Sequence, residues 1–288
     1  MPSIATKAAD DPPVPDRWQQ DLAELRAELD CIDDALHDLL MRRAEVVERV
    51  GLVKPDRGLA FRPGRQAAIL RRRLARHRGA LPAQGIVAIW LELLSATIAM
   101  QTSFTVAVCE AGATYAFTQL AREQFGALVP VHTFHDPVQA LADVRSGRAA
   151  VAVLPLPSDT ETWWTGLLGR NEPRLHVVAL VPFWRPRPEG VPAVQALVAA
   201  SVAPDPSGDD RTLIGLECDP GVSRARIEAS LAAAGLGSVE LLVCGSEGAL
   251  AKVPGFVAED DPRLADIAAV LRPPVVLGAY AVPVGASA

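Results

Sequence analysis

The hydrophobic positions change their spacing along the chain, and the changes divide it into three parts. In the first part apolar side chains recur every three or four residues from Asp16 to Val53, which predicts one long α-helix. The helix is expected to stop near Gly51 and Pro55, because both residue types interrupt helices. The apolar stripe consists of Leu22, Leu25, Leu29, Ile32, Leu36, Leu39, Leu40, Val46, Val47 and Val50.

The length of this helix bears on how the protein assembles. Nearly forty helical residues at ~1.5 Å each extend roughly 55–60 Å, which is longer than a small domain is wide. Two shorter helices are predicted at residues 63–79 and 83–101, and they cannot cover so long a stripe. We therefore expect an all-α first part of three helices that forms an intertwined homodimer.

The second and third parts have the pattern of short buried strands alternating with helices, which is typical of α/β folds. From Arg211 the elements follow the order βαββαβ, the order of a ferredoxin-like sandwich. The stretch "APDPSGDD" at 203–210 is predicted to be a linker between the two parts. The strands expected in the second part span 104–110, 129–134, 149–156 and 175–183, and its helices span 114–126 and 136–147.

Composition and charge exclude several classes of function. A formal net charge of -6 argues against general nucleic-acid binding. The four cysteines form no CxxC pair, which favours a reducing cytoplasm over a disulfide framework or a zinc site. The longest apolar run is interrupted by Glu92 and is too short to span a membrane. Residues 1–15 have no apolar core, so we expect a disordered tail and not a signal peptide.

The basic residues are nearly all arginines, since Lys7, Lys54 and Lys252 are the only lysines. Arg26 and Arg43 lie on the predicted long helix, and Lys54 follows it. A guanidinium group binds both oxygens of a carboxylate in one plane, whereas an ammonium group directs a single hydrogen at one oxygen. The single lysine beside two arginines raises the question whether these three cations share one purpose.

Three stretches carry a resemblance to a known family: "LRAELDCIDDALHDLLMRRAEVVERVGLVK", "FRPGRQAAIL" and "IWLELLSATIAMQ". Their charged residues have the spacing of the all-helical chorismate mutases, in particular the mutase domain of the bifunctional P-proteins of phenylalanine synthesis. The resemblance implies an isomerase that rearranges chorismate to prephenate with no metal and no cofactor. Each arginine taken alone is as well explained by a solvated helix surface, so the joint occurrence of the charged residues carries the resemblance.

The resemblance also implies a role for each matching residue. Arg26 and Arg43 match the carboxylate-binding arginines, and Arg26 is expected to reach the partner's site. Lys54 and Gln101 match the two donors to the breaking ether oxygen, where loss of one donor typically costs about 10²–10³ in rate. The catalytic set is Lys54, Gln101, Arg43 and Arg26, and the substrate-binding set is Arg26, Arg43, Arg65, Gln66 and Thr97.

Two of these positions depart from the commonest pattern of the family. Gln66 stands where a glutamate holds the ring hydroxyl, and an amide oxygen accepts that hydrogen bond without the help of a charge. Thr97 stands where serine is often found and keeps the hydroxyl. Neither change removes a cation.

The second part resembles one lobe of prephenate dehydratase, through "VAVCEAGATYAFTQLA" and "VAVLPLPSD". Ala116 occupies the family's serine position, and Pro157 and Ser158 replace its Glu-Asn pair. Gln195 lies within a stretch that replaces the catalytic Thr-Arg-Phe motif. A dehydratase must protonate a leaving hydroxyl, so we expect a degenerate scaffold in which that activity is lost.

The third part resembles the ACT domain that binds phenylalanine and closes the P-proteins, through "DPRLADIAAVLRPPVVLGAYAVP". Its ligand-binding loop reads Gly221-Val222-Ser223-Arg224, and its second motif reads Leu242-Val243-Cys244-Gly245. Both depart from the family, so a dimerisation role is favoured, with an aromatic amino-acid effector as the alternative.

The sequence thus predicts a cytoplasmic, multidomain α plus α/β protein. Its parts are a tail at 1–15, a helical chorismate mutase domain at 16–103, a single-lobe dehydratase-like section at 104–203 and an ACT-like domain at 211–288. Three alternatives stay open: a bifunctional chorismate mutase/prephenate dehydratase, an isochorismate pyruvate lyase, and a non-catalytic protein that senses a ligand or dimerises. No nucleic acid or membrane is expected as a partner.

Overall fold

The chain forms two compact units, Met1–Pro55 and Asp56–Ala288. The structure is a computed structural model. It describes residues 17–53, 60–110, 112, 114–169, 171–218, 222–246, 248–268 and 272–285.

The first unit contains helix α1 (Arg17–Val53), a single helix of 37 residues, which confirms the predicted long helix. None of its residues is buried. The apolar stripe is open along its length, and Leu39, for example, is 61% exposed. A helix of this length with an open apolar face gains most of its stability only when another surface packs on that face.

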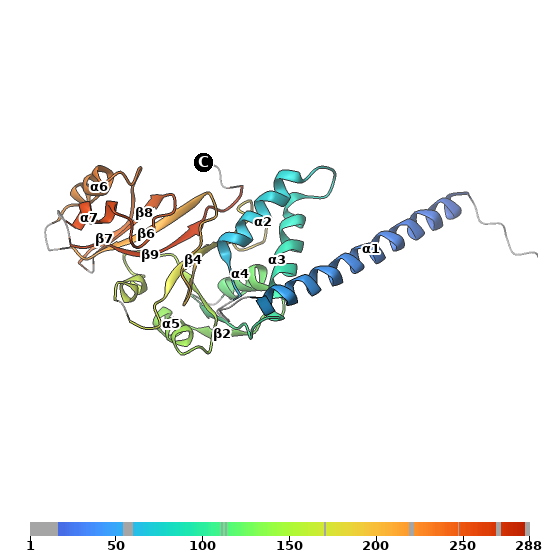
Figure 1. Ribbon diagram of the computed structural model, residues 1–288, viewed down its shortest axis with the longest axis horizontal. Helices are drawn as coiled ribbons and strands as arrows, with labels where there is room; N and C mark the ends of the chain where they lie inside the picture. The colour runs from blue at the N-terminus through green and yellow to red at the C-terminus, as the bar shows by residue number, and fades with distance from the viewer. Residues whose placement is uncertain are drawn as a thin grey trace, which may run out of the picture. The chain divides into compact units, whose positions relative to one another are not determined.

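The second unit is built on one mixed sheet, which has nine strands among the described residues. Figure 1 labels several of these strands together with the helices. The strands are β1 (Val106–Cys109), β2 (Val131–Phe134), β3 (Val151–Pro155), β4 (His176–Val181), β5 (Ala196–Ala200), β6 (Asp210–Leu216), β7 (Glu240–Gly245), β8 (Gly248–Pro254) and β9 (Val275–Ala281). The helices are α2 (Pro63–Arg76), α3 (Ala83–Ala99), α4 (Ala116–Phe125), α5 (Pro137–Arg145), the 3₁₀ turn η1 (Trp163–Leu167), α6 (Arg224–Ala233) and α7 (Arg263–Ala268).

The strand order is β2-β1-β3-β5-β4-β9-β6-β8-β7. β2, β1 and β3 are parallel neighbours, as a βαβαβ unit requires. The last four strands in this order are antiparallel neighbours. With α6 and α7 between them in the chain, they confirm the βαββαβ order predicted from Arg211 onward.

The two halves of the sheet join where β4 lies parallel to β9, at the pair Val177 and Gly278. Gly278 has a φ of +140°, and a Cβ atom added there would clash with the carbonyl oxygen of Val177. Only glycine lets the two backbones approach so closely. The sheet therefore runs on across the stretch that the sequence marks as a linker, and the division of the chain into three domains stays a prediction.

Strand β5 is a difference from the sequence-based expectation, which assigns no strand there. It consists of alanine, leucine and valine only, and all five residues are buried between β3 and β4. Alanine is depleted in strands, so a short alanine-rich segment carries little strand signal. Its burial on both sides in the sheet is what makes it a strand.

Helices α2 and α3 form an antiparallel hairpin that packs on the sheet around Phe183 and Ala281. At the end of the hairpin where α2 begins and α3 ends, Phe61 packs edge-on against Phe104, with ring centroids 5.9 Å apart. Phe61 precedes α2 and Phe104 follows α3. Phe61 also contacts Phe125 of α4 at 5.4 Å. This aromatic cluster fixes the beginning of α2 beside the end of α3.

Candidate functional site

Four of the predicted site residues come from the same end of the α2–α3 hairpin. Arg65 and Gln66 lie in the first turn of α2, Thr97 lies in the last turn of α3, and Gln101 follows it. The hairpin brings these turns together because its helices are antiparallel and the aromatic cluster around Phe61 joins their ends. The two pairs are about thirty positions apart in the sequence, and the hairpin is what brings their helix ends together.

The first turn of α2 is capped from far along the chain. The carboxylate of Asp205 accepts hydrogen bonds from the backbone N–H groups of Gly64 and Arg65, each at 3.2 Å. The guanidinium of Arg62 pairs with the same carboxylate at 3.3 Å. A carboxylate at a helix N-terminus satisfies N–H groups that have no partner within the helix. Arg65 therefore has a fixed backbone while its side chain is exposed.

Gln66 points the other way. It is buried and lines a cavity of about 20 Å³ together with Gln124 of α4 and residues of β4. The side-chain oxygen of Gln124 is buried without a hydrogen-bond partner among the described residues. A cavity of this size holds roughly one water molecule and no larger ligand. The substrate-binding role of Gln66 stays a prediction. Because Gln66 is buried, that role requires the first turn of α2 to move so that this side chain becomes accessible.

Thr97 and Gln101 are linked to each other through the helix backbone. The Thr97 hydroxyl is buried and donates to the carbonyl oxygen of Leu94 at 2.9 Å. The side-chain amide of Gln101 is partly exposed and donates to the carbonyl oxygen of Thr97 at 3.3 Å. The second bond is long, so the amide can turn to a better acceptor at small cost. Gln101 is thus available as a donor, whereas the Thr97 hydroxyl is satisfied within α3.

The remaining cations come from the first unit. Arg26 and Arg43 both lie on α1, which is continuous between them. At about 1.5 Å per residue their Cα atoms are about 25 Å apart along the helix axis. Lys54 lies outside the described residues. The second unit contributes one cation to the predicted site among its described residues, namely Arg65.

The region that resembles the dehydratases has its own candidate site, at the carboxyl ends of β1, β2 and β3. Glu110 follows β1, is buried, and accepts hydrogen bonds from the backbone N–H groups of Thr118 at 2.6 Å and Phe117 at 3.4 Å. It thereby occupies the N-terminus of α4, where an anionic ligand would otherwise bind. Tyr115, directly before α4, has a left-handed backbone (φ 49°) and is exposed.

The electrostatics at these strand ends oppose an anionic substrate. Burial, together with the negative charges of Glu161, Asp136 and Glu110, raises the pKa of the Cys109 thiol to about 11. The thiol is therefore protonated at neutral pH and is no nucleophile. Three carboxylates that raise the pKa of one thiol make the potential at these strand ends negative, which disfavours an anionic ligand there.

The predicted effector motifs of the third part are only partly described. Gly221 lies outside the described residues, and Leu242 to Gly245 lie on β7, the edge strand of the sheet. The described residues contain no cluster of histidine, cysteine or carboxylate side chains that could hold a metal ion. Over the same residues no helix is long and apolar enough to cross a membrane.

Two functional features escape sequence reasoning. The capping role of Asp205 involves groups 140 and 141 positions away, and the sequence around it, "APDPSGDD", has only the signature of a turn. Arg71 extends from α2 to the backbone of the same stretch, and the arginine that follows it, Arg72, is exposed. Neither residue carries a local signal that could have identified its role.

Comparison with known proteins finds a family that the helical part of the chain resembles. The pattern of the family described as chorismate mutase type II matches residues 25–102. A bifunctional chorismate mutase/prephenate dehydratase of Aquifex aeolicus is 30% identical over 150 residues, which are 49% of this chain and 40% of that protein. One from Neisseria gonorrhoeae is 30% identical over 157 residues, 54% of this chain and 41% of the relative. The chain thus spans about two fifths of the length of these relatives.

Among solved structures, a prephenate dehydratase of Arthrobacter aurescens in complex with L-Phe covers 62% of this chain and 89% of its own, with 15% identity and a TM-score of 0.42. Because this TM-score is low, the fold of the α/β region rests on the strand order given above. The family match covers the helices that carry the predicted site residues. Residues 25–102 of this chain are thus similar to the chorismate mutases of type II.

Proposed function

We propose that the chain is a chorismate mutase, which rearranges chorismate to prephenate in aromatic amino-acid biosynthesis, and that it works as a homodimer. The observation that carries the proposal is the continuity of α1 together with the family match. Arg26 and Arg43 are about 25 Å apart on one helix, and arginine side chains reach ~7 Å each, so one small dicarboxylate cannot contact both from a single chain. A second chain, antiparallel along α1, brings the partner's Arg26 to the Arg43 end.

The open apolar stripe of α1 supports the same assembly. Leu25, Leu29 and Leu36 are all more than half exposed, and they lie between the two arginines or beside them. Burying an apolar side chain of this size contributes ~1.5–3 kcal/mol. Pairing two such stripes would thus stabilise the dimer and place the two arginines of different chains at each of two equal sites.

The reaction needs little from the protein beyond position and charge. It is pericyclic, so no nucleophile and no proton transfer are required. Arg26 of one chain and Arg43 of the other hold the two carboxylates, with Arg65 on the exposed side of α2. Lys54 and Gln101 donate hydrogen bonds to the ether oxygen, where negative charge grows as the bond breaks. Donors that are already in place stabilise this charge without reorganisation at the moment of reaction.

The α/β region is proposed to be a scaffold that has lost dehydratase activity, because Glu110 fills the N-terminus of α4 and the strand ends are acidic. The βαββαβ part is proposed to be ACT-like and to serve dimerisation. An aromatic amino-acid effector, a second enzymatic activity and the pyruvate lyase reaction on isochorismate are the competing proposals.

The test is to incubate the purified chain with chorismate, follow its loss, and identify the product by chromatography. Prephenate is the expected product. Lys54→Ala should lower kcat by at least about a hundredfold with its helical circular dichroism intact. Arg43→Ala should also raise KM, whereas Arg42→Ala, its exposed neighbour on α1, is the matched control and should be close to wild type. Release of pyruvate from isochorismate without mutase activity would contradict the proposal.

A further inference from the structure

A second polar cavity lies in the C-terminal half of the sheet, and none of its lining residues is a predicted site residue. Its volume is about 790 Å³, and it is lined by the ends of β6, β7, β8 and β9 and the segment after β4. Ile214 and Val253 belong to the core beneath α6 and α7. Their neighbours Leu213 and Lys252 therefore face the other side of the sheet, because side chains alternate along a strand. The cavity lies on this face, which α6 and α7 leave uncovered.

Three cations line this cavity, and two of them have carboxylate partners. Lys252 pairs with Glu240 across β7 and β8 at 2.6 Å. Arg211 lies 3.6 Å from the carboxylate of Asp209, too far for a hydrogen bond. Three cations against two carboxylates leave one positive charge on the lining. A lining of this charge favours a ligand with a single negative charge over a polyanion.

Arg185 is the third cation, and the structure gives it no compensating group. Among the described residues its side chain makes no hydrogen bond and no ion pair, and its Nε atom is buried without a partner. Burial lowers the pKa of Arg185, which expresses the cost of desolvating its charge. A buried donor on a cation is costly when it is unsatisfied, so an anion in the cavity would remove that cost.

Tyr280 supplies a neutral donor next to Arg185. It is directly opposite Arg211 in the pairing of β6 with β9, so their side chains share one face. Burial raises the pKa of Tyr280 to about 12, with Arg211 and Arg185 acting in the opposite direction. The phenol is therefore protonated at neutral pH. It lies within electrostatic reach of both arginines and can donate to a bound oxygen.

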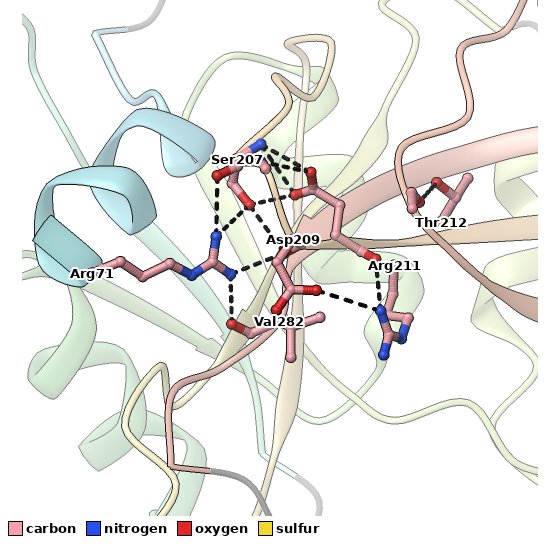
Figure 2. A network of polar contacts seen from close by, with 9 residues as sticks. Arg71, Ser207, Asp209, Arg211, Thr212 and Val282 are labelled. Atoms are coloured by element: carbon pink, nitrogen blue, oxygen red, sulfur yellow. Dashed lines mark hydrogen bonds and ion pairs between the residues drawn. The ribbon is translucent and has the colours of Figure 1, made fainter. Parts of the chain in front are cut away.

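The rim of the cavity is held in place from outside. Arg71 of α2 donates hydrogen bonds to the carbonyl oxygens of Asp209 at 2.9 Å and Val282 at 2.8 Å, and Figure 2 shows its guanidinium between these two residues and Ser207. Asp209 and Val282 both line the cavity. The cavity is thus preorganised, which lowers the entropic cost of binding a ligand.

We propose that this cavity binds a small organic monocarboxylate with an apolar body, the carboxylate contacting Arg185 and the body contacting Leu180, Val239 and Val282. The apolar walls distinguish such a ligand from inorganic phosphate, which would leave them in water. No residue of the proposed mutase site takes part. Success or failure of the mutase proposal therefore leaves this one unaffected.

The test uses benzoate as the charged probe and benzamide as its uncharged match, each titrated into the full chain and followed by calorimetry and protein NMR. Benzoate should bind saturably with a Kd of about 1–10 mM, as expected for a fragment of this size. Benzamide should bind at least about tenfold more weakly, because charge-assisted hydrogen bonds are the stronger kind. No saturable binding of benzoate up to about 50 mM, or equal binding of benzamide, would overturn the proposal.

Variants locate the binding. Arg185→Gln should weaken benzoate at least about tenfold, and Tyr280→Phe, which removes only the hydroxyl, should weaken it by about three- to tenfold. Arg122→Gln makes the same change at an exposed arginine of α4 and should bind benzoate as the wild type does. Unchanged affinity in both Arg185→Gln and Tyr280→Phe would place the ligand elsewhere and refute the assignment. Mutase activity of Arg185→Gln should be that of the wild type.

Discussion

The guanidinium of Arg71 donates a hydrogen bond of 2.8 Å to the carbonyl oxygen of Val282, 211 positions along the chain. The same side chain also donates to the carbonyl oxygens of Ser207 and Asp209 and to the Ser207 hydroxyl, as Figure 2 shows. One arginine of α2 thus joins the helical hairpin to the start of β6 and the end of β9. Three of these four hydrogen bonds go to backbone carbonyl oxygens, which every residue type provides.

Replacing Arg71 should loosen this joint. Arg71→Met keeps the length of the side chain and removes all four hydrogen bonds, so the free energy of unfolding of the second unit should fall by about 2–3 kcal/mol. Urea denaturation followed by tryptophan fluorescence measures it. Arg72→Met, the exposed neighbour, should change stability by less than about 0.5 kcal/mol. Equal effects of the two substitutions would contradict the assigned role of Arg71.

Gly278 should tolerate no side chain. Gly278→Ala would drive a methyl group into the carbonyl oxygen of Val177 and separate β9 from β4, costing at least about 4 kcal/mol or preventing folding. Gly147→Ala is the control, since Gly147 also has a positive φ (+74°) but open space around it. It should cost only about 1–2 kcal/mol for the left-handed backbone. Thermal unfolding of both variants separates the clash from the backbone strain.

The shared site can be tested by mixing two inactive proteins. Arg26→Ala and Lys54→Ala homodimers should each be nearly inactive. After chain exchange each heterodimer should contain one site with both residues intact, and mutase activity should reappear. Silence after exchange, verified by mass spectrometry of differently tagged chains, would argue that each site is built within a single chain.

The buried carboxylate of Asp143 should make the second unit sensitive to acid. Asp143 is 2% exposed, and it accepts from the Arg148 Nε at 2.6 Å and contacts the His132 Nδ1 at 2.7 Å. Burial raises the pKa of the Asp143 carboxyl, but the hydrogen bonds from His132 and Arg148 outweigh burial and leave this pKa below its ordinary value. The stability from the ionised form is therefore complete above about pH 4 and is lost as the pH falls below it.

Asp143→Asn should accordingly cost about 2–3 kcal/mol at pH 7 and less at pH 3, so the difference from wild type should shrink as the solution is acidified. Asp159→Asn changes an exposed carboxylate and should leave the pH dependence as it is. Guanidinium denaturation at a series of pH values gives the comparison. A difference that is constant with pH would show that Asp143 contributes through packing alone.

Prephenate should not be dehydrated by this chain. Glu110 occupies the N-terminus of α4, and Ala116 and Gln195 replace catalytic groups of the dehydratases that this part resembles. Incubation with prephenate near neutral pH should give phenylpyruvate at the uncatalysed rate. The intact chain must be used, because deleting residues 211–288 would remove β9 and expose β4 as a sheet edge. Catalysed phenylpyruvate formation would favour the bifunctional alternative.

The elements with strong periodicity could be predicted from the sequence, and those that depend on distant partners could not. The stripe along α1 and the βαββαβ order both carry local signals, namely spacing and alternation, and both are confirmed. Strand β5 carries almost none, because its alanines favour no strand until two neighbours enclose them. The carboxylate of Asp205 acts on a helix 140 positions away, and sequence neighbours say nothing about such a contact.

The candidate site divides in the same way. The roles predicted for Arg26, Arg43, Arg65 and Gln101 come from the resemblance to the chorismate mutases, and they stay predictions. The exposure of the predicted site residues could not be predicted from the sequence. Gln66 and Thr97 are buried, whereas Arg65, one position before Gln66, is exposed. Helical rotation of about 100° per residue decides this, and the packing partner that fixes the rotation is the sheet.

The position of β9 has a consequence for the order in which the protein is made. Among the described strands it is the last in chain order, yet it lies in the interior of the sheet between β4 and β6. A ribosome therefore completes β1 to β8 before the strand that unites them can leave the exit tunnel. Until then β4 and β6 both present open edges to neighbouring nascent chains. Helix α1 emerges long before that, so in the proposed dimer two chains can pair through α1 before either sheet is closed.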